Sequence, residues 1–296
     1  MKTTIIALII IRICAFQLNA QAINQEIAKD GKTPYLIGEI DQTGLEGGHY
    51  SNWFIKNYND YKPNPLLINS ITAELKSYSI KLFMGTWCGD SKKEVPRFLK
   101  VLEACDFPSD QLMIIAVSNA PNMYKQSPQH EEVGLNIHRV PTLIFYKKGK
   151  EVNRIVEHPI NTFEEDIQQI ITNNDYRSNY QIVTTIDNIL RKKGVNGLKK
   201  KSEKLLKTFK DKVSSVYELN TYGRILFGTD RKEDAIAVFT LNTELFPDQP
   251  RSYMSLANTL GMNDNKEDAI KVLENAIKRH PDNEDLKKNL KAIKSN

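Results

Sequence analysis

Cysteine is scarce in this chain of 296 residues, which contains only Cys14, Cys88 and Cys105. Cys14 lies in a segment that we expect to be removed, and the two remaining cysteines are too few for a disulfide-stapled scaffold. The five histidines show no metal-ligand spacing. Glycines do not form a phosphate-binding loop, and no Gly-x-Ser-x-Gly nucleophile elbow occurs. We therefore expect no metal and no cofactor.

Long apolar runs are also missing beyond the N-terminus. Residues 5–11 form an apolar run after the positive Lys2, and Ala20-Gln21-Ala22 supplies a small-x-small cleavage site. Residues 1–22 are therefore expected to be a signal peptide that is cleaved near Ala22. An uncleaved anchor is the alternative, but a spanning helix needs about 20 apolar residues. We expect an extracytoplasmic protein, periplasmic or secreted, with no transmembrane segment after cleavage.

Positive charge is concentrated in one segment. Residues 191–212 hold ten Lys and Arg against two acidic residues, whereas the whole chain has a net charge of +5. Such a segment can bind nucleic acid or anionic lipid. However, apolar residues recur at helical spacing here: Leu198, Leu205, Leu206, Phe209, Val213 and Val216. An amphipathic helix with a solvated, lysine-rich face explains the charge, and we expect no nucleic-acid partner.

The first half of the chain alternates strand and helix patterns. Residues 23–60 are a lead-in with a predicted strand at 35–40. Within residues 61–175, strands are predicted at 79–85, 112–117, 142–146 and 151–157, and helices at 65–76, 92–104 and 162–171. A polar, irregular segment covers 118–139. This order predicts an α/β domain with a central mixed sheet and helices on both faces.

The second half, residues 176–296, lacks strand patterns and contains a repeat. The sequence KEDAI occurs at 232–236 and again at 266–270, and Pro247 is followed by Pro281, both 34 residues apart. This period and its pattern of small and apolar residues resemble tetratricopeptide repeats, here at about 216–249 and 250–283. Asn242 stands where a small residue is usual. The resemblance implies paired helices that form a groove for a protein partner.

The stretch MGTWCGDSKKEVP at 84–96 lies where a predicted strand meets a predicted helix. With Pro96, its Trp87, Cys88, Gly89 and Lys92 resemble the active-site helix of the thioredoxin superfamily. Val140-Pro141-Thr142-Leu143 resembles the cis-proline loop of that superfamily. The resemblance implies a thioredoxin-like fold over 61–175, with a cis bond before Pro141 and Pro141 packed beside Cys88. It also implies a peptide-binding surface formed by Trp87, Gly89, Val140 and Pro141.

Three positions depart from that pattern. Ser91 replaces the second cysteine, Asp90 replaces the usual proline, and Leu82 stands where thioredoxins carry a buried aspartate. Cys105 cannot be the second thiol, because 17 helical residues separate it from Cys88 by about 26 Å. A disulfide requires Cα atoms within about 4.4–6.8 Å. A single thiol can form a mixed disulfide with a substrate but cannot resolve it alone.

The neighbours of Cys88 have opposing expected effects on a thiolate. A helix N-terminus and Lys92 favour the negative charge, and Asp90 disfavours it. Ser91 is a candidate hydrogen-bond donor to the sulfur. His138 and Arg139 precede Pro141 and are candidate modulators, although an ordinary loop histidine explains His138 equally well. A lone cysteine can also be a small buried hydrophobe, but the polar turn around Cys88 argues against deep burial.

These features predict an exported thiol–disulfide exchange protein that acts on exported client proteins or peptides. Cys88 and Ser91 are the predicted catalytic residues, and the repeats are predicted to bind a client or another protein partner. The alternative is a non-enzymatic adaptor that uses a degenerate thioredoxin fold and the repeat groove only for protein binding.

Overall fold

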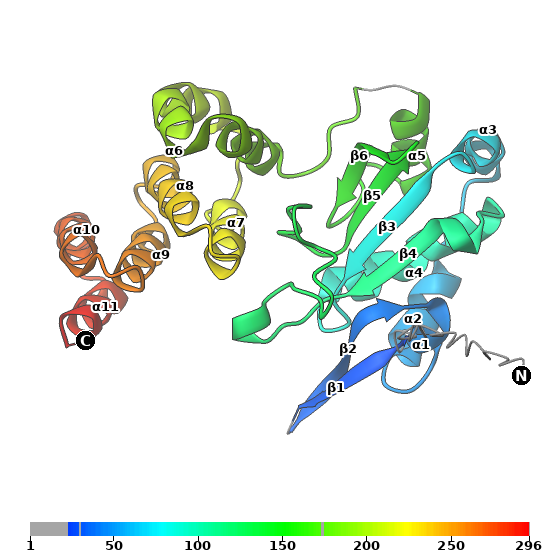
Figure 1. The fold of residues 1–296 in the computed structure, drawn as a ribbon, viewed down its shortest axis with the longest axis horizontal. Coiled ribbons are helices and arrows are strands. Elements are labelled where there is room, and N and C mark those ends of the chain that lie inside the picture. The colour runs from blue at the N-terminus through cyan, green and yellow to red at the C-terminus, as the bar shows by residue number, and fades with distance from the viewer. Residues whose placement is uncertain (1–22, 30, 173–174, 296) are drawn as a thin grey trace, which may run out of the picture.

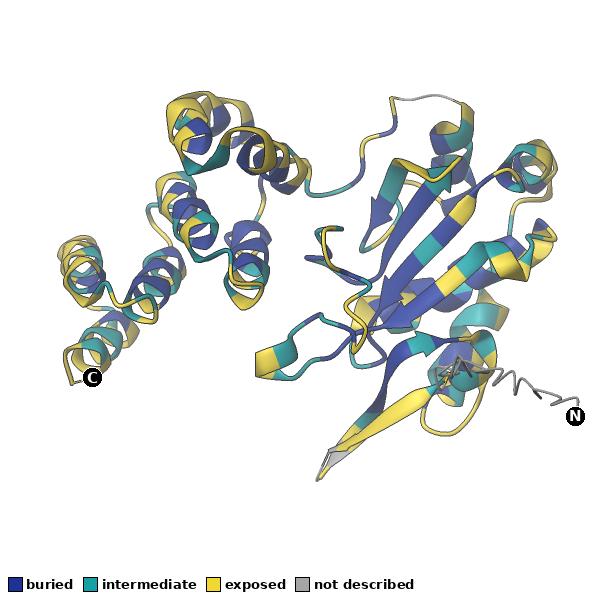
Figure 2. Ribbon diagram, viewed as in Figure 1, coloured by how far each residue is buried: buried dark blue, intermediate teal, exposed yellow. Residues whose placement is uncertain are grey.

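The computed structural model describes residues 23–29, 31–172 and 175–295. Two parts follow one another along the chain (Figure 1): a sheet region, residues 23–172, and a helical region, residues 181–295. Each part has its own buried apolar core, and buried residues are concentrated on the strands and on the inner sides of the helices (Figure 2). The predicted signal peptide lies outside the described residues.

The sheet region contains a mixed six-stranded sheet, as predicted. Its strands, in the spatial order β1-β2-β4-β3-β5-β6, are β1 (Gln25–Lys29), β2 (Lys32–Ile40), β4 (Leu112–Ala116), β3 (Ser79–Met84), β5 (Thr142–Lys147) and β6 (Lys150–Val156). Strands β3 and β4 are parallel, and every other neighbouring pair is antiparallel. In this order β3 is one of the two central strands, and the short loop after its C-terminal end leads to Cys88.

The helices of the sheet region lie in one layer. They are α1 (Gln42–Glu46), α2 (Ser51–Asp60), α3 (Pro65–Leu75), α4 (Gly89–Ala104) and α5 (Phe163–Thr172). Helices α2 to α5 share one core with Leu82 and Phe145 of the sheet. On the opposite face, Phe83 and Ile144 pack under Ile137 and Val140. The sequence predicts helices on both faces, and this prediction is wrong for the second face. Residues 118–139 cover the second face, and they contain only the short 3₁₀ helix η2 (Pro121–Met123).

Local sequence signals explain several element ends. The Asn64 side chain accepts a hydrogen bond of 3.0 Å from the Leu66 amide and caps α3, as its position predicts. The β5–β6 hairpin turns through Lys148 and Gly149, with φ of 51° and 74°. Positive φ at both turn residues is what a two-residue hairpin loop of type I′ requires.

The lead-in is more ordered than the sequence indicates. Besides the predicted strand, it contributes β1, α1 and α2, and the Asp41 side chain caps α1 by accepting from the Gly44 amide. Strand β2 runs antiparallel to β4. The Leu36 amide of β2 donates to Thr86 Oγ1 at 3.0 Å, which fastens this added strand to the loop that carries Cys88.

The helical region contains α6 (Gln181–Phe209), α7 (Tyr217–Gly228), α8 (Lys232–Leu245), α9 (Pro250–Gly261), α10 (Lys266–Arg279) and α11 (Glu284–Ser295). The first and last residues of α10 lie 34 positions after those of α8, in agreement with the sequence period. Ala235 and Ala269 are fully buried at equivalent positions. Asn242 is also buried, and its Nδ2 donates to Val216 O and Asn220 Oδ1, both at 3.0 Å.

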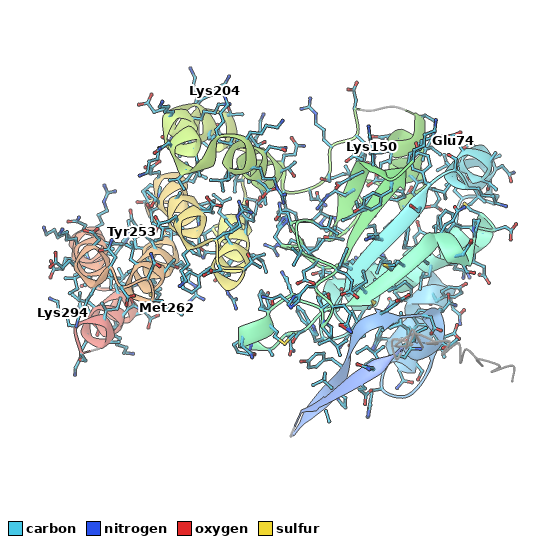
Figure 3. The ribbon with its side chains drawn as sticks, in the orientation of Figure 1. Glu74, Lys150, Lys204, Tyr253, Met262 and Lys294 are labelled. Atoms are coloured by element: carbon cyan, nitrogen blue, oxygen red, sulfur yellow. The ribbon has the colours of Figure 1, made fainter. Side chains whose placement is uncertain are left out.

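The basic segment is an amphipathic helix, as expected. Leu198, Leu205 and Phe209 of α6 are buried in the helical core, whereas Lys204 points outward from α6 (Figure 3). The described part of α6 bends at Gly194, whose φ is 60°. Across residues 23–295, apart from the gaps at 30 and 173–174, the structure contains no helix with the length and apolar character needed to cross a membrane.

Candidate functional site

Cys88 stands at the junction between β3 and α4. It is the N-cap residue of α4 and is partly exposed. Its carbonyl oxygen accepts the first helical hydrogen bond, from the Lys92 amide at 3.0 Å, and its own amide donates to Gly85 O at 2.8 Å. The thiol therefore lies at the positive end of the helix dipole, where negative charge on sulfur is favoured.

Trp87 packs against the C-terminal end of β4, beside Cys88. Its Nε1 donates to Val117 O at 2.7 Å, and its ring centroid is 6.1 Å from that of Tyr124. The indole lies so close to Gly85 that a Cβ atom there would come within 2.5 Å of the ring. Gly85 thus permits the position of Trp87, whereas Gly89 is exposed and has open space beside it.

The loop before β5 meets Cys88. The Val140–Pro141 peptide bond is cis, as the sequence predicts, and the Cys88 thiol donates to the Val140 carbonyl oxygen over 3.3 Å. Thr142 Oγ1 donates to Arg139 O at 2.7 Å, and the Glu157 amide donates to Pro141 O at 2.7 Å. These bonds hold the loop in place, and Trp87 and Cys88 pack against the apolar cluster that contains Val140.

Ser91 does not hydrogen-bond to the thiol. Its side chain is fully buried, and its Oγ accepts a hydrogen bond from the Gly85 amide at 3.2 Å. The expectation of a Ser91 donor to the sulfur is therefore wrong for this structure, since the hydroxyl is turned toward the loop backbone. Ser91 instead fixes the turn that positions Cys88.

Asp90 and Lys92 remain close to the site at the start of α4. Asp90 is exposed and Lys92 is partly buried, and neither forms an ion pair within the described residues. The neighbouring Lys93 is engaged elsewhere, in an ion pair of 2.9 Å with Glu94. Asp90 and Lys92 therefore place one charge of each sign on the solvent side of the first helical turn.

His138 is not a source of positive charge for Cys88. Its ring is buried, and this burial lowers the pKa of His138 to about 3. Nδ1 donates to Asn136 O at 3.2 Å, and the ring packs edge-on against Tyr180, which directly precedes α6, and against Tyr222 of α7. The predicted role as a charged modulator is corrected: near neutral pH His138 is an uncharged contact between the two regions.

Arg139 likewise connects the regions. Its guanidinium pairs with Glu157 at 3.1 Å, lies 4.8 Å from the Tyr180 ring centroid and donates to Tyr217 O at 3.3 Å. The Tyr180 hydroxyl also donates to Glu157. Because Arg139 directly precedes Val140, this cluster ties the cis-proline loop to the helical region. The Glu157 carboxylate offsets much of the charge that Arg139 was expected to offer Cys88.

Lys125, which the sequence did not single out, is a buried lysine beside the cis-proline loop. Its side chain is only 5% exposed, and its Nζ donates to His138 O. Burial, followed by the nearby charge of Arg139, lowers the pKa of Lys125 to about 7, while Cys88 and Glu157 act in the opposite direction. Lys125 Nζ thus lies against the backbone that leads into the cis-proline loop. No periodic pattern in 118–139 marks it as buried.

Cys105 takes no part in the site. It is completely buried at the other end of α4, and both Cys88 and Cys105 are free thiols. Burial raises the pKa of the Cys105 thiol. Within the described residues, no three His, Cys, Asp or Glu side chains are grouped so that they could hold a metal ion.

Three of the cavities are lined by residues of both the sheet region and the helical region, and none of the three includes Cys88. The largest, of about 760 Å³, is lined by residues of the 118–139 segment and of α6 to α8. Its charged residues of both signs pair locally, as in the 2.7 Å ion pair between Arg231 and Asp234. The candidate site is therefore identified by the contacts of Cys88 and not by the position of a cavity.

Comparison with known proteins does not add to this picture. No protein-family model matches the chain, and no curated protein matches it.

Proposed function

We propose that this chain is an extracytoplasmic thiol–disulfide exchange protein whose nucleophile is Cys88. The observation that carries the proposal is the 3.3 Å contact between Cys88 Sγ and the carbonyl oxygen of Val140, in the loop with the cis bond to Pro141. A partly exposed thiol at a helix N-terminus, beside the Val140 carbonyl and the partly exposed Trp87 indole, suits attack on a disulfide in an extended chain.

The exchange conserves electrons. The Cys88 thiolate attacks one sulfur of a client disulfide, a bond forms between them, and the other client sulfur leaves as a thiolate. A second client thiolate then attacks the client sulfur of this mixed disulfide and expels the Cys88 thiolate. The client exchanges one disulfide for another, and no external reductant is consumed.

The missing second thiol favours isomerisation over net reduction. The hydroxyl of Ser91 occupies the position of a resolving cysteine, and the fully buried Leu82 supplies no proton carrier beneath it. Cys105 lies at the far end of α4.

We assign a thioredoxin-like fold to residues 61–172, with β1 and β2 of the lead-in as strands added to its sheet, and tetratricopeptide-like repeats to the helical region. The six-stranded mixed sheet, the cis bond at Pro141 and the 34-residue offset between α8 and α10 support these assignments. The helical region would hold a client protein or partner while Cys88 exchanges disulfides. The sequence of residues 1–22 supports export to the compartment where disulfides persist.

A refolding assay tests the proposal. Reduced protein, from Ile23 onward, is added to ribonuclease with scrambled disulfides, and recovery of ribonuclease activity is followed. The wild-type chain and Cys105→Ala should accelerate recovery several-fold over buffer, and Cys88→Ser should not. Equal acceleration by Cys88→Ser and the wild-type chain would refute a role for Cys88.

An adaptor function is the second candidate, favoured by the apolar Leu82 and by the inward-facing Ser91 hydroxyl. An adaptor would bind its partner without breaking or forming disulfides. In the same assay it predicts no acceleration by any variant, together with partner binding that is unchanged in Cys88→Ser.

A further inference from the structure

A second, smaller cavity opens between the two regions, with a volume of about 390 Å³. One wall comes from the 118–139 segment, with Pro121 and Tyr124. The other comes from the inner sides of α7 and α9 and carries Arg224, Arg251 and Met254. We refer to this cavity as the interdomain groove.

The charge in the interdomain groove is of one sign. Its lining contains Arg224 and Arg251 and no acidic residue. Both arginines are exposed, and neither forms an ion pair with any residue that the structure describes. Arg231, in the larger cavity, differs because Asp234 neutralises it at 2.7 Å. The groove therefore presents two positive charges that no acidic side chain among the described residues neutralises.

Other lining residues favour a peptide over a simple anion. Phe227, Met254 and Met262 form apolar surface, and Met262 is 68% exposed at the end of α9, where Figure 3 labels it. Asn289 Nδ2 donates to Asn258 Oδ1 at 2.9 Å. A chain with acidic and apolar side chains would satisfy both the arginines and this apolar surface.

The groove connects to the reactive thiol through two ring contacts. Arg224 lies with its Cζ 4.4 Å from the centroid of the Tyr124 ring, and the Tyr124 ring is 6.1 Å from the indole of Trp87. Trp87 immediately precedes Cys88 in the sequence. Ring contacts thus link Arg224 in the groove to the residue that precedes the thiol.

We infer that the interdomain groove binds an acidic, partly apolar peptide segment of the client, with carboxylates on Arg224 and Arg251. This inference rests on the proposed function only in calling the segment part of a client. The helical region would select clients that carry acidic residues near the cysteine that Cys88 attacks.

Fluorescence anisotropy with cysteine-free peptides tests this inference separately from disulfide exchange. The probe is a short fluorescein-labelled peptide of Glu, Leu and Ala, and its counterparts carry Gln or Lys in place of Glu. The wild-type chain should bind the Glu peptide more tightly than the Gln peptide, and added salt should weaken this preference. Arg224→Gln and Arg251→Gln should each weaken the Glu peptide by about two- to fivefold.

The double variant Arg224→Glu/Arg251→Glu should lose the Glu peptide and bind the Lys peptide, which shows that it is folded. Arg279→Glu, an exposed arginine of α10 outside the groove lining, is the matched control and should bind as the wild-type chain does. Cys88→Ser should also leave binding unchanged. Equal affinity for the Glu and Gln peptides, or undiminished Glu binding by the double variant, would overturn the inference. Loss of ribonuclease refolding in Cys88→Ser with either result would leave the proposed function intact.

Discussion

Cys88 Sγ and Val140 O lie 3.3 Å apart although 52 residues separate them in the sequence. The sheet creates this contact, because β3 ends at the loop before Cys88 and pairs with β5, which begins just after Pro141. The thiol is therefore held by the rigid centre of the sheet region. Preorganised neighbours at a rigid position are what a selective nucleophile needs.

Ser91→Cys should convert the site from one thiol to two. Position 91 lies one turn after Cys88 at the start of α4, and residues three apart face the same side of a helix. Under oxidising conditions we expect a disulfide between Cys88 and the introduced thiol. The variant should also reduce insulin at least about tenfold faster than the wild-type chain, because the second thiol releases the mixed disulfide. Mass spectrometry after alkylation detects the bond. Two freely alkylated thiols after oxidation would contradict the prediction, and Ser91→Ala is the control without a thiol.

Lys125→Met should change how stability depends on pH. The pKa of Lys125 is about 7 in the folded chain, below its usual value of 10.5, so the unfolded chain binds more protons between these values. The free energy of unfolding contributed by Lys125 should therefore rise with pH from about 7 to about 10.5, by up to about 5 kcal/mol. Urea unfolding at several pH values should show this rise in the wild-type chain and a smaller one in Lys125→Met. Parallel curves would contradict the burial of this cation.

His138→Phe should reduce acid sensitivity. His138 has its pKa lowered to about 3 by burial, so its stabilising contribution is complete above about pH 6.5 and is lost as the pH falls toward 3. Between pH 6.5 and 4 the wild-type chain should lose up to about 3 kcal/mol more stability than the variant. Phenylalanine keeps the aromatic packing on Tyr180 and Tyr222. Equal acid midpoints for the two proteins would show that His138 is accessible to protons when folded.

Gly223→Ala should destabilise the helical region. A Cβ atom at Gly223 would lie 2.6 Å from the Phe239 ring, inside van der Waals contact, and we expect a loss of about 1–3 kcal/mol in the free energy of unfolding. Gly228→Ala, also in α7, is the matched control, because its nearest neighbour is 3.9 Å away. Thermal unfolding should show a lower Tm for the first variant and an unchanged or slightly higher Tm for the second.

Periodic patterns predicted the sheet and the repeat helices well. Strands β3 to β6 and helices α3 and α5 lie within two residues of their predicted ends, because alternating or helical apolar spacing and the Asn64 cap are local signals. The contacts at Cys88 followed from two motifs that a single sheet brings together. The cis bond before Pro141 was likewise predicted from its motif.

Residues without such signals could not be placed from the sequence. Burial of Lys125 and His138 depends on how an irregular segment folds over Phe83 and Ile144 and meets the helical region, and no spacing in the sequence encodes that. The orientation of Ser91 is set by the Gly85 amide, a contact of the folded turn. The helix layer expected on the second face is replaced by this same irregular segment.

The reaction of Cys88 with a small aromatic disulfide tests the central proposal most directly. In the Cys105→Ala chain at pH 7, the rate of mixed-disulfide formation is measured for the folded protein and for the same protein unfolded in urea, with a free cysteine peptide in both solvents as the reference. If Cys88 is a preorganised nucleophile, the folded chain reacts faster than the unfolded chain after this correction, forms one adduct and releases it to added thiol. A folded chain that reacts no faster than the unfolded one would contradict the exchange function and leave protein binding as its role.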